Sequence, residues 1–276
     1  MIQPFYCGRY VLDAARPLIM GIVNLTDDSF SGDGCASDVG AAREHALRLV
    51  AEGAHILDLG AESSRPGAEP VSINQEIDRL LPVIEAIKDC GAVISVDTVK
   101  PEVMRVAINA GVDMINDISA LRAPGSLELV AQSQVAVSLM HMQGSPRDMQ
   151  LNPTYGNVVD EIAAFLGERV AAAEAAGIAL NRICLDPGFC FGKSLAHNMI
   201  LLRRLDELQV PGLPVLVGLS RKSMLGLVTG RPVNERLAAG IAAHVIAAIK
   251  GAKIFRVHDV AATRDALAVV SAMEDY

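Results

Sequence analysis

The segment AVISVDTVKPEVMRVAINAGVDMINDIS (92–119) contains the pattern on which the rest of the chain is built. An apolar run ends at Asp97 and Thr98, Pro101 begins a helical stretch, and a second apolar run ends at Asn116 and Asp117. Strand, helix and strand in this order form a βαβ unit with parallel strands. Near-continuous apolar runs, rather than strict alternation, are typical of strands buried on both faces of a parallel sheet.

Short apolar, β-branched runs of the same kind recur along the whole sequence. They are LIMGIVN (18–24), AHILDLG (54–60), AVISVDT (92–98), MINDIS (114–119), VAVSLMHM (135–142), ICLDPGF (183–189), PVLVGLS (214–220) and KIFRVHD (253–259). Eight such units in about 250 residues predict a single-domain (β/α)8 TIM barrel over residues 1–276. A doubly wound sheet is the main alternative, but its G-x-G-x-x-G opening is absent from the sequence. Phe5–Tyr6 and Tyr10–Val11 are expected to form a short N-terminal hairpin across the barrel floor.

The composition excludes several classes of protein. The 276 residues are 51% hydrophobic and carry a net charge of −8, which argues against a disordered chain and against nucleic acid or an anionic membrane as partner. The longest apolar stretch, 237–249, is shorter than the ~20 residues of a membrane span. Five cysteines without a C-x-x-C motif predict neither a disulfide framework nor a zinc site, so a cytoplasmic location is expected. Of only six Phe, four (30, 189, 191 and 255) are expected at or near the barrel mouth.

Polar residues collect where the apolar runs end. They are Asn24, Asp58, Glu62, Asp97, Asn116, Asp117, His141, Asp186, Ser220 to Ser223, Arg256, His258 and Asp259. In a (β/α)8 barrel these positions face the carboxyl-terminal mouth, where active sites are built. Taken singly, Asp97 or Asp117 could instead cap the following helix, and we interpret His141 as a buried core residue.

Two loops and a group of cations suggest what the mouth binds. The loops TDDSFSGDGCASD (26–38) and AESSRPGAEPVS (61–72) exceed the usual βα length of about 2–6 residues and are interpreted as lids. The cations Arg65, Lys193, Arg221, Lys222, Arg256 and His258 suit a multiply charged anion such as a diphosphate, shared with a metal. The acceptors Asp97, Asn116 and Asp186 suit the paired N–H donors of an aminopyrimidinone ring.

An ordered set of motifs then resembles a known family. The motifs are MGIVNLTDDSFSGDG (20–34), DLGAESSRPG (58–67), SVDT (95–98), INDIS (115–119), LMHMQGSPRDMQ (139–150), LDPGFCFGK (185–193), GLSRKS (218–223) and RVHDV (256–260). Together they resemble the dihydropteroate synthases of bacterial folate biosynthesis. The resemblance implies a transferase that joins 6-hydroxymethyl-7,8-dihydropterin diphosphate to p-aminobenzoate and releases diphosphate. It also implies inhibition by sulfonamides, which mimic p-aminobenzoate.

The resemblance also assigns roles to individual residues. It implies catalytic roles for Lys222, Asp97, Arg256 and His258. It implies substrate contacts for Ser64, Arg65, Asp97, Asn116, Met140, Asp186, Phe191, Gly218, Lys222, Ser223, Arg256, Val257 and His258, with Phe30 and Pro66 near p-aminobenzoate. Asn24 matches a magnesium-binding asparagine, so Mg2+ is the expected cofactor.

The sequence departs from the family pattern at a few positions. Asp27 stands where the first loop usually has Pro, and the loop acid is displaced to Asp33, which leaves open whether Asp28 or Asp33 assists the metal. Ser64 replaces the more usual Thr and keeps the hydroxyl, and Cys190 replaces a Gly.

Three other functions stay open at this point. A pterin-dependent methyltransferase would share the pterin acids, a Schiff-base aldolase would use Lys222 or Lys193, and a catalytically silent relative would bind pterin without turnover.

Because LAAGIAAHVIAAI (237–249) is apolar nearly all round, a homodimer through the C-terminal helices is expected.

Overall fold

The computed structural model describes residues 4–26, 38–63, 67–208 and 210–275, and its main feature is a parallel sheet that curls into a barrel. The eight strands are β3 (Leu18–Asn24), β4 (Ile56–Gly60), β5 (Val93–Asp97), β6 (Met114–Asp117), β7 (Ala136–Met140), β8 (Ile183–Asp186), β9 (Leu216–Val217) and β10 (Ile254–Val257). Their order is β8-β7-β6-β5-β4-β3-β10-β9. A parallel bridge between Leu185 and Val215 brings the two edge strands together. The predicted (β/α)8 barrel is confirmed.

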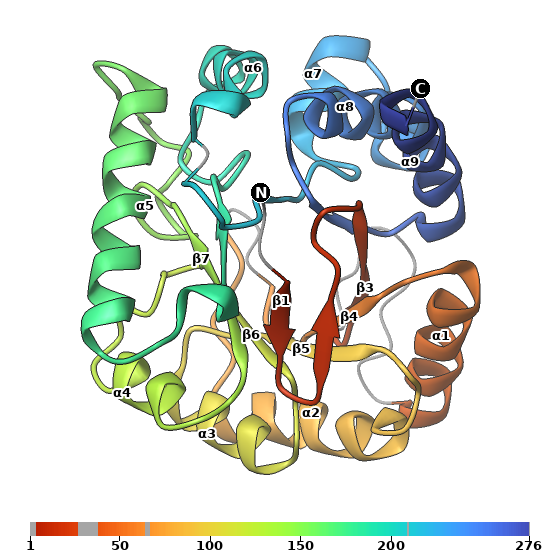
Figure 1. The fold of residues 1–276 in the computed structure, drawn as a ribbon, viewed down its shortest axis with the longest axis vertical. Helices are drawn as coiled ribbons and strands as arrows, with labels where there is room; N and C mark the ends of the chain where they lie inside the picture. The colour runs from red at the N-terminus through yellow and green to blue at the C-terminus, as the bar shows by residue number, and fades with distance from the viewer. Residues whose placement is uncertain (1–3, 27–37, 64–66, 209, 276) are drawn as a thin grey trace.

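Helices connect the strands and surround the barrel (Figure 1). They are α1 (Val39–Glu52), α2 (Ile73–Ile87), α3 (Pro101–Asn109), α4 (Ser126–Ala131), α5 (Val158–Ala175), α6 (Leu195–Arg203), α7 (Ser223–Thr229), α8 (Leu237–Ile249) and α9 (Val260–Asp275), with 3-10 turns at Leu180–Arg182, Leu205–Leu208 and Val233–Glu235. Local sequence sets their starts: Asp38 caps α1, and Ser72 with Gln75 forms a capping box on α2. None of the helices in the described part of the chain is both long and apolar enough to cross a membrane.

The N-terminal hairpin closes one end of the barrel. Strands β1 (Phe5–Cys7) and β2 (Tyr10–Leu12) pair antiparallel, and in Figure 1 the hairpin, drawn in red, lies across the centre of the ring. Phe5 and Cys7 are buried against the residues with which the barrel strands begin, such as Ile56 and Val93. The predicted hairpin across the floor is therefore confirmed.

Alternation along the strands decides which side chains reach the interior. In β4, β5 and β10 the first residues, Ile56, Val93 and Ile254, belong to the apolar floor cluster. Two residues further on, the same faces carry Asp58, Ser95 and Arg256, because successive strand residues point to opposite sides of the sheet. The residues between them pack outward against the helices in the main core. The barrel interior thus changes from apolar at the floor to polar at the mouth.

This alternation corrects the expected place of two Phe side chains. Phe255 lies on the outer face of β10 and is fully buried in the main core, as is Phe189. Phe191 lines the cavity at the mouth, and Phe30 lies outside the described residues. The expectation that the Phe189 and Phe255 side chains lie at the mouth, where flat substrates would bind, is therefore wrong.

Candidate active site

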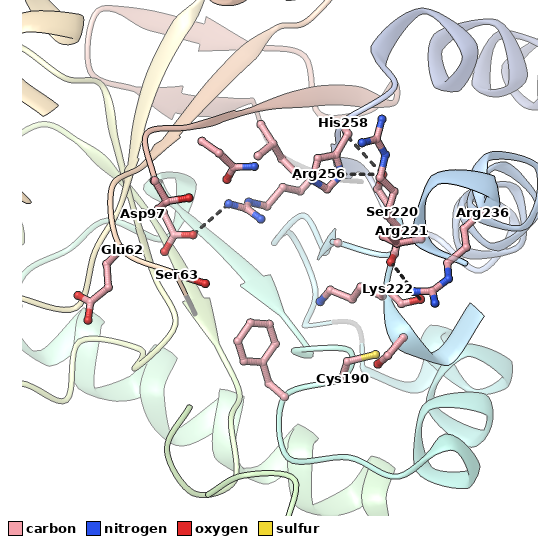
Figure 2. Close-up of a pocket in the computed structure, with 18 of the residues that line it drawn as sticks. Glu62, Ser63, Asp97, Cys190, Ser220, Arg221, Lys222, Arg236, Arg256 and His258 are labelled. Atoms are coloured by element: carbon pink, nitrogen blue, oxygen red, sulfur yellow. Dashed lines mark hydrogen bonds and ion pairs between the residues drawn. The ribbon is translucent and has the colours of Figure 1, made fainter. Parts of the chain in front are cut away.

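The carboxyl ends of the barrel strands open into a cavity of about 750 Å³. Its charged lining is Lys222, Arg221, Arg236, Arg256 and His258 on the cationic side, with Asp97 and Glu62 opposite (Figure 2). A cavity of this size accommodates a small organic molecule with much of its surface enclosed. The concentration of cations in a chain of net charge −8 makes this the natural place for an anionic substrate.

A buried network around Asp58 organises the centre of the site. The Asp58 carboxylate is fully buried and accepts hydrogen bonds from Arg256 Nε (2.6 Å), Ser95 Oγ (2.6 Å) and Asn116 Nδ2 (3.1 Å). Arg256 Nη2 donates to Asp97 Oδ2 at 3.0 Å. Burial opposes the charge of Arg256, but the Asp58 and Asp97 carboxylates raise its pKa above the ordinary value. The guanidinium is therefore held in one orientation by two strands, β4 and β5.

Two further carboxylates provide acceptors beside this network. Burial raises the pKa of Asp97 to about 7, against the opposing effect of Arg256. Burial also raises the pKa of Asp186, while Lys222 and the hydrogen bond from Gly188 N (2.7 Å) oppose it. Acids with raised pKa values, grouped beside fixed cations, are typical of a functional site rather than of helix caps.

Lys222 and Phe191 form the opposite wall of the cavity. Lys222 Nζ donates to the Phe189 carbonyl at 2.5 Å and lies 4.8 Å from the centre of the Phe191 ring. Burial lowers the pKa of Lys222. Gly218 follows β9 and lines the cavity beside Lys222 and Arg256. Lys222, Phe191, Gly218 and Arg256 thus line the same cavity.

The cationic rim comes from the last two strand ends. His258 Nδ1 lies 2.9 Å from Ser220 Oγ, so the hydroxyl sets the orientation of the imidazole. Arg221 pairs with Asp259 at 2.8 Å, and Arg236 Nη1 donates to the Arg221 carbonyl at 3.1 Å. Both arginines line the cavity, and their contacts fix the backbone on either side of Lys222.

The structure places the predicted site residues in three groups. Those that line the cavity are Asn24, Asp97, Phe191, Gly218, Lys222, Ser223, Arg256 and His258. Asn116 and Asp186 are almost buried at inward positions of β6 and β8, and Met140 packs behind Phe191 in a small cluster with Met149. Ser64 and Arg65, with Phe30, Pro66, Asp28 and Asp33, lie outside the described residues.

Val257 and Lys193 are placed differently from expectation. The Val257 side chain is fully buried in the main core, because its neighbours Arg256 and His258 take the inward positions of the strand end. Lys193 does not reach the cavity as a mouth cation. Its Nζ is buried and lies 2.9 Å from Gly188 O, 3.0 Å from Phe191 O and 3.0 Å from His141 Nδ1. His141 itself is buried edge-on to Phe165, in line with its interpretation as a core residue.

Neither Asp97 nor Asp117 caps the following helix, because the N-cap residues of α3 and α4 are Lys100 and Gly125. The Asp117 carboxylate accepts from Ser119 N at 2.7 Å and Leu121 N at 2.8 Å, so it shapes the turn that follows β6. Asp97 instead faces Arg256 across the cavity. Strand-end position alone did not separate these two roles.

Sequence reasoning missed the roles of Asp58 and Arg236. Asp58 was visible as a charged residue inside an apolar run, and its inward position follows from the alternation of Ile56, Asp58 and Gly60. Arg236 stands beside α8 and follows no strand, so no pattern in the sequence points to the cavity. Its place there depends on how the α7–α8 segment folds back over the mouth.

Asn24 is a fitting ligand for a divalent cation among the described residues. Asn24 ends β3 and lines the cavity, and a side-chain amide oxygen is a suitable hard donor for Mg2+. Within 4–26, 38–63, 67–208 and 210–275, no three His, Cys, Asp or Glu side chains converge as a metal cluster. Such a site fits an ion held mainly by substrate phosphates and water rather than by a protein cage.

A (β/α)8 barrel with buried acceptors and a cationic rim at its mouth is typical of a barrel enzyme with a small-molecule site. Residues 20–258 match the family model described as "Pterin binding enzyme". Dihydropteroate synthase of Escherichia coli (strain K12) is 48% identical over 262 residues, which cover 95% of this chain and 93% of that protein. The chain belongs to the dihydropteroate synthase family.

Solved structures give the same result. Burkholderia cenocepacia dihydropteroate synthase complexed with 7,8-dihydropteroate is 45% identical, with a TM-score of 0.91 over 99% of this chain and 97% of that one. The Xanthomonas albilineans enzyme with 4-aminobenzoic acid is 50% identical, with a TM-score of 0.93 over 100% of both chains. Relatives of this identity favour dihydropteroate synthesis over the methyltransferase and aldolase alternatives.

Proposed function

We propose that the cavity condenses 6-hydroxymethyl-7,8-dihydropterin diphosphate with p-aminobenzoate to give 7,8-dihydropteroate and diphosphate. The observation that carries the proposal is the convergence of Asp97, Asn116 and Asp186 with Lys222, Arg256 and His258 at one barrel mouth. The complexes of relatives with 7,8-dihydropteroate and with 4-aminobenzoic acid support the two substrates.

The pterin ring binds deep in the mouth. Its amino group and ring N–H groups donate to Asp97 and Asp186, and the Asn116 amide supplies both a donor and an acceptor. Burial makes this set selective, because a ring with the wrong donors would leave buried acceptors unpaired. Arg256, fixed by Asp58, lies beside the ring, with Lys222 and Phe191 on the opposite wall.

The diphosphate binds at the rim formed by His258 and Arg256. Asn24 would hold Mg2+ together with the diphosphate oxygens, and the ion would offset the negative charge that develops on the leaving group. Fixed cations are effective here because their orientation is set before the substrate arrives: Ser220 orients His258, and Asp58 orients Arg256.

The reaction exchanges one bond for another at the pterin methylene carbon. The C–O bond breaks with its electron pair leaving on diphosphate, and the electron-rich dihydropterin stabilises the resulting methylene cation. The aniline nitrogen of p-aminobenzoate then forms the C–N bond and loses a proton. Catalysis rests on positioning, charge stabilisation and exclusion of water, and requires no strong general base.

Lys222→Ala is expected to lower kcat/KM for both substrates by about 10²-fold, because it removes the cation between Phe191 and Asp186. Steady-state kinetics measure the effect. Lys250→Ala is the matched control, since Lys250 pairs with the exposed Asp206 at 3.2 Å away from the cavity. Near-normal turnover of Lys222→Ala would remove that residue from the catalytic set.

The proposed function is tested by mixing the protein with pterin diphosphate, p-aminobenzoate and Mg2+. Dihydropteroate and diphosphate are expected in equal amounts, and omission of any one component is expected to reduce product formation. Pterin binding without product would show a silent pterin-binding protein instead. Omission of Mg2+ tests the proposed cofactor separately from the two substrates.

A homodimer through the C-terminal helices is also part of the proposal. Five apolar side chains on α8 and α9 are strongly exposed: Leu237 (46%), Ile246 (45%), Ile249 (57%), Val269 (71%) and Met273 (60%). These two helices pack against each other, so their exposed apolar residues lie on neighbouring elements. Exposed apolar surface of this kind is typical of an interface.

Light scattering at micromolar concentration is expected to give about twice the 29.2 kDa chain mass. Val269→Glu with Met273→Lys is expected to give the monomer, because charges at exposed apolar positions disfavour association while leaving the barrel core untouched. A monomeric wild-type chain would contradict the dimer. A cytoplasmic location remains an expectation from the cysteine content.

A further inference from the structure

Lys100 holds the two ends of the second strand-end loop together. Lys100 stands immediately before α3, and its Nζ donates to Glu62 Oε2 at 2.5 Å and to the Val71 carbonyl at 2.6 Å. Glu62 is the second residue of this loop (61–72), and Val71 is the one before its last. Glu62 Oε1 in turn accepts from Val71 N at 3.3 Å, so the three residues form a closed ring of contacts.

A third contact ties this ring to the body of the protein. Lys100 Nζ also donates at 2.6 Å to Glu76 Oε2, and Glu76 is fully buried in the first turns of α2. Its second oxygen, Oε1, has no hydrogen-bond partner among the described residues. A buried carboxylate needs a countercharge, and Lys100 supplies it. Burial opposes the charge of Lys100, but the Glu62 and Glu76 carboxylates raise its pKa, so the ammonium stays charged.

The ring of contacts determines how the loop meets the cavity. Figure 2 shows the Glu62 carboxylate turned away from the other labelled cavity residues, whereas Ser63 points toward them. Both residues line the cavity. Fixing the Glu62 side chain on Lys100 therefore fixes the direction in which Ser63 leaves the strand end. On the far side, the loop contacts the β7–α5 segment through a hydrogen bond from Gly67 N to Pro146 O at 3.3 Å.

We propose that Lys100 is a positioning residue that holds Glu62 and Val71 together near the two ends of the second strand-end loop and, through the placement of Ser63, sets the affinity for p-aminobenzoate. This inference rests on the proposed function. The proposed pterin contacts lie on the inward faces of the strands, whereas the three hydrogen bonds of Lys100 Nζ go to Glu62, Val71 and Glu76. Residues that follow a strand end lie further from the barrel floor than the inward strand residues. The affinity for the substrate that binds toward the rim, here p-aminobenzoate, therefore depends on their placement. Ser63 follows Glu62 and lines the cavity, so its placement depends on the contact between Glu62 and Lys100.

Lys100→Met is expected to raise KM for p-aminobenzoate about tenfold, while kcat and KM for pterin diphosphate change less than about threefold. Lys100→Arg, which keeps the charge and can contact both carboxylates, is expected to restore KM for p-aminobenzoate to within about threefold of wild type. Glu62→Ala is a second variant that leaves the Lys100–Glu76 pair intact and is expected to raise the same KM. If Lys100→Met does not fold, Glu62→Ala still tests the proposal.

Arg9→Met is the matched control. Arg9 also pairs with a buried carboxylate, Asp113, at 2.9 Å, but at the barrel floor, so loss of this pair is expected to lower stability without changing either KM. Equal increases in both KM values of Lys100→Met, or no increase for p-aminobenzoate in Lys100→Met and Glu62→Ala, would overturn the proposal.

Hydrogen exchange provides a measurement that is independent of turnover. The Val71 amide is expected to exchange faster in Lys100→Met and in Glu62→Ala than in wild type, because its acceptor or the support of that acceptor is lost. Unchanged exchange in both variants would contradict the anchoring role. A wild-type chain with no turnover at all would contradict the proposed function, and exchange would then still decide whether Lys100 anchors the loop.

Discussion

Asp97→Ala is expected to lower kcat/KM for pterin diphosphate by about 10²-fold or more. The variant removes an acceptor for the ring N–H groups and leaves Arg256 paired only with Asp58. The measurement is steady-state turnover with pterin diphosphate varied at saturating p-aminobenzoate. Near-normal kinetics would remove Asp97 from the site and leave Asp186 as the principal acceptor.

The pH dependence of kcat/KM tests whether Asp97 is the cause of this loss. Because burial raises the pKa of Asp97 to about 7, the ionised acceptor is formed only as pH rises through 7, and kcat/KM is expected to rise with it. In Asp97→Asn this rise is expected to disappear.

As pH rises, the contribution of Asp97 to stability falls, whereas kcat/KM is expected to rise. The folded protein holds this proton more tightly than the unfolded chain, so the group's contribution to stability falls as pH increases from about 4 to 7. Asp97→Asn is therefore expected to unfold at the wild-type temperature or above it at pH 8, which separates lost activity from lost folding.

Asp58→Ala is expected to show the largest combined effect, with unfolding free energy reduced by about 3–5 kcal/mol. The substitution leaves the buried donors of Ser95, Asn116 and Arg256 without their shared acceptor. Because Arg256 then loses its fixed orientation, kcat/KM is expected to fall by about 10²-fold as well. Chemical denaturation and steady-state kinetics measure the two effects on the same preparation.

Asp113→Ala is the matched control for Asp58→Ala. Asp113 is another buried carboxylate with several donors, Arg9 and Ile94 N, but it lies at the floor, where the strands begin. Its loss is expected to reduce stability and leave kcat/KM unchanged below the unfolding transition. If both variants lost turnover in proportion to stability, Asp58 would have no specific role in the site.

Much of the fold and site could be predicted because both follow local rules. Eight apolar runs separated by helical patterns required a parallel sheet, and the residues that end the runs had to meet at one end of it. The pattern therefore predicts that Asp97, Lys222, Arg256 and His258 lie in one site. In the structure, Arg256 Nη2 lies 3.0 Å from Asp97 Oδ2, although 159 residues separate the two in the sequence.

Residues that contribute through a partner distant in sequence could not be assigned. Asp58 and Asp117 look alike in the sequence, as acids within or at the end of apolar runs, but one holds Arg256 and the other shapes a turn. Lys193 and Lys222 are both lysines near strand ends, but only Lys222 lines the cavity, while the Nζ of Lys193 is enclosed by the carbonyls of its own loop. Pairing across the barrel depends on strand register and side-chain direction.

The sequence by itself determined the barrel, the floor hairpin and the end of the barrel at which the site lies, because hydrophobic periodicity and chain connectivity leave few alternatives. Only the tertiary structure decided which side chains face inward, which carboxylate holds which cation, and how Lys100 ties Glu62 to Val71. These features depend on contacts of a few ångströms between segments far apart in the chain. Local pattern does not encode such contacts, because each is set by the closure and register of the whole sheet.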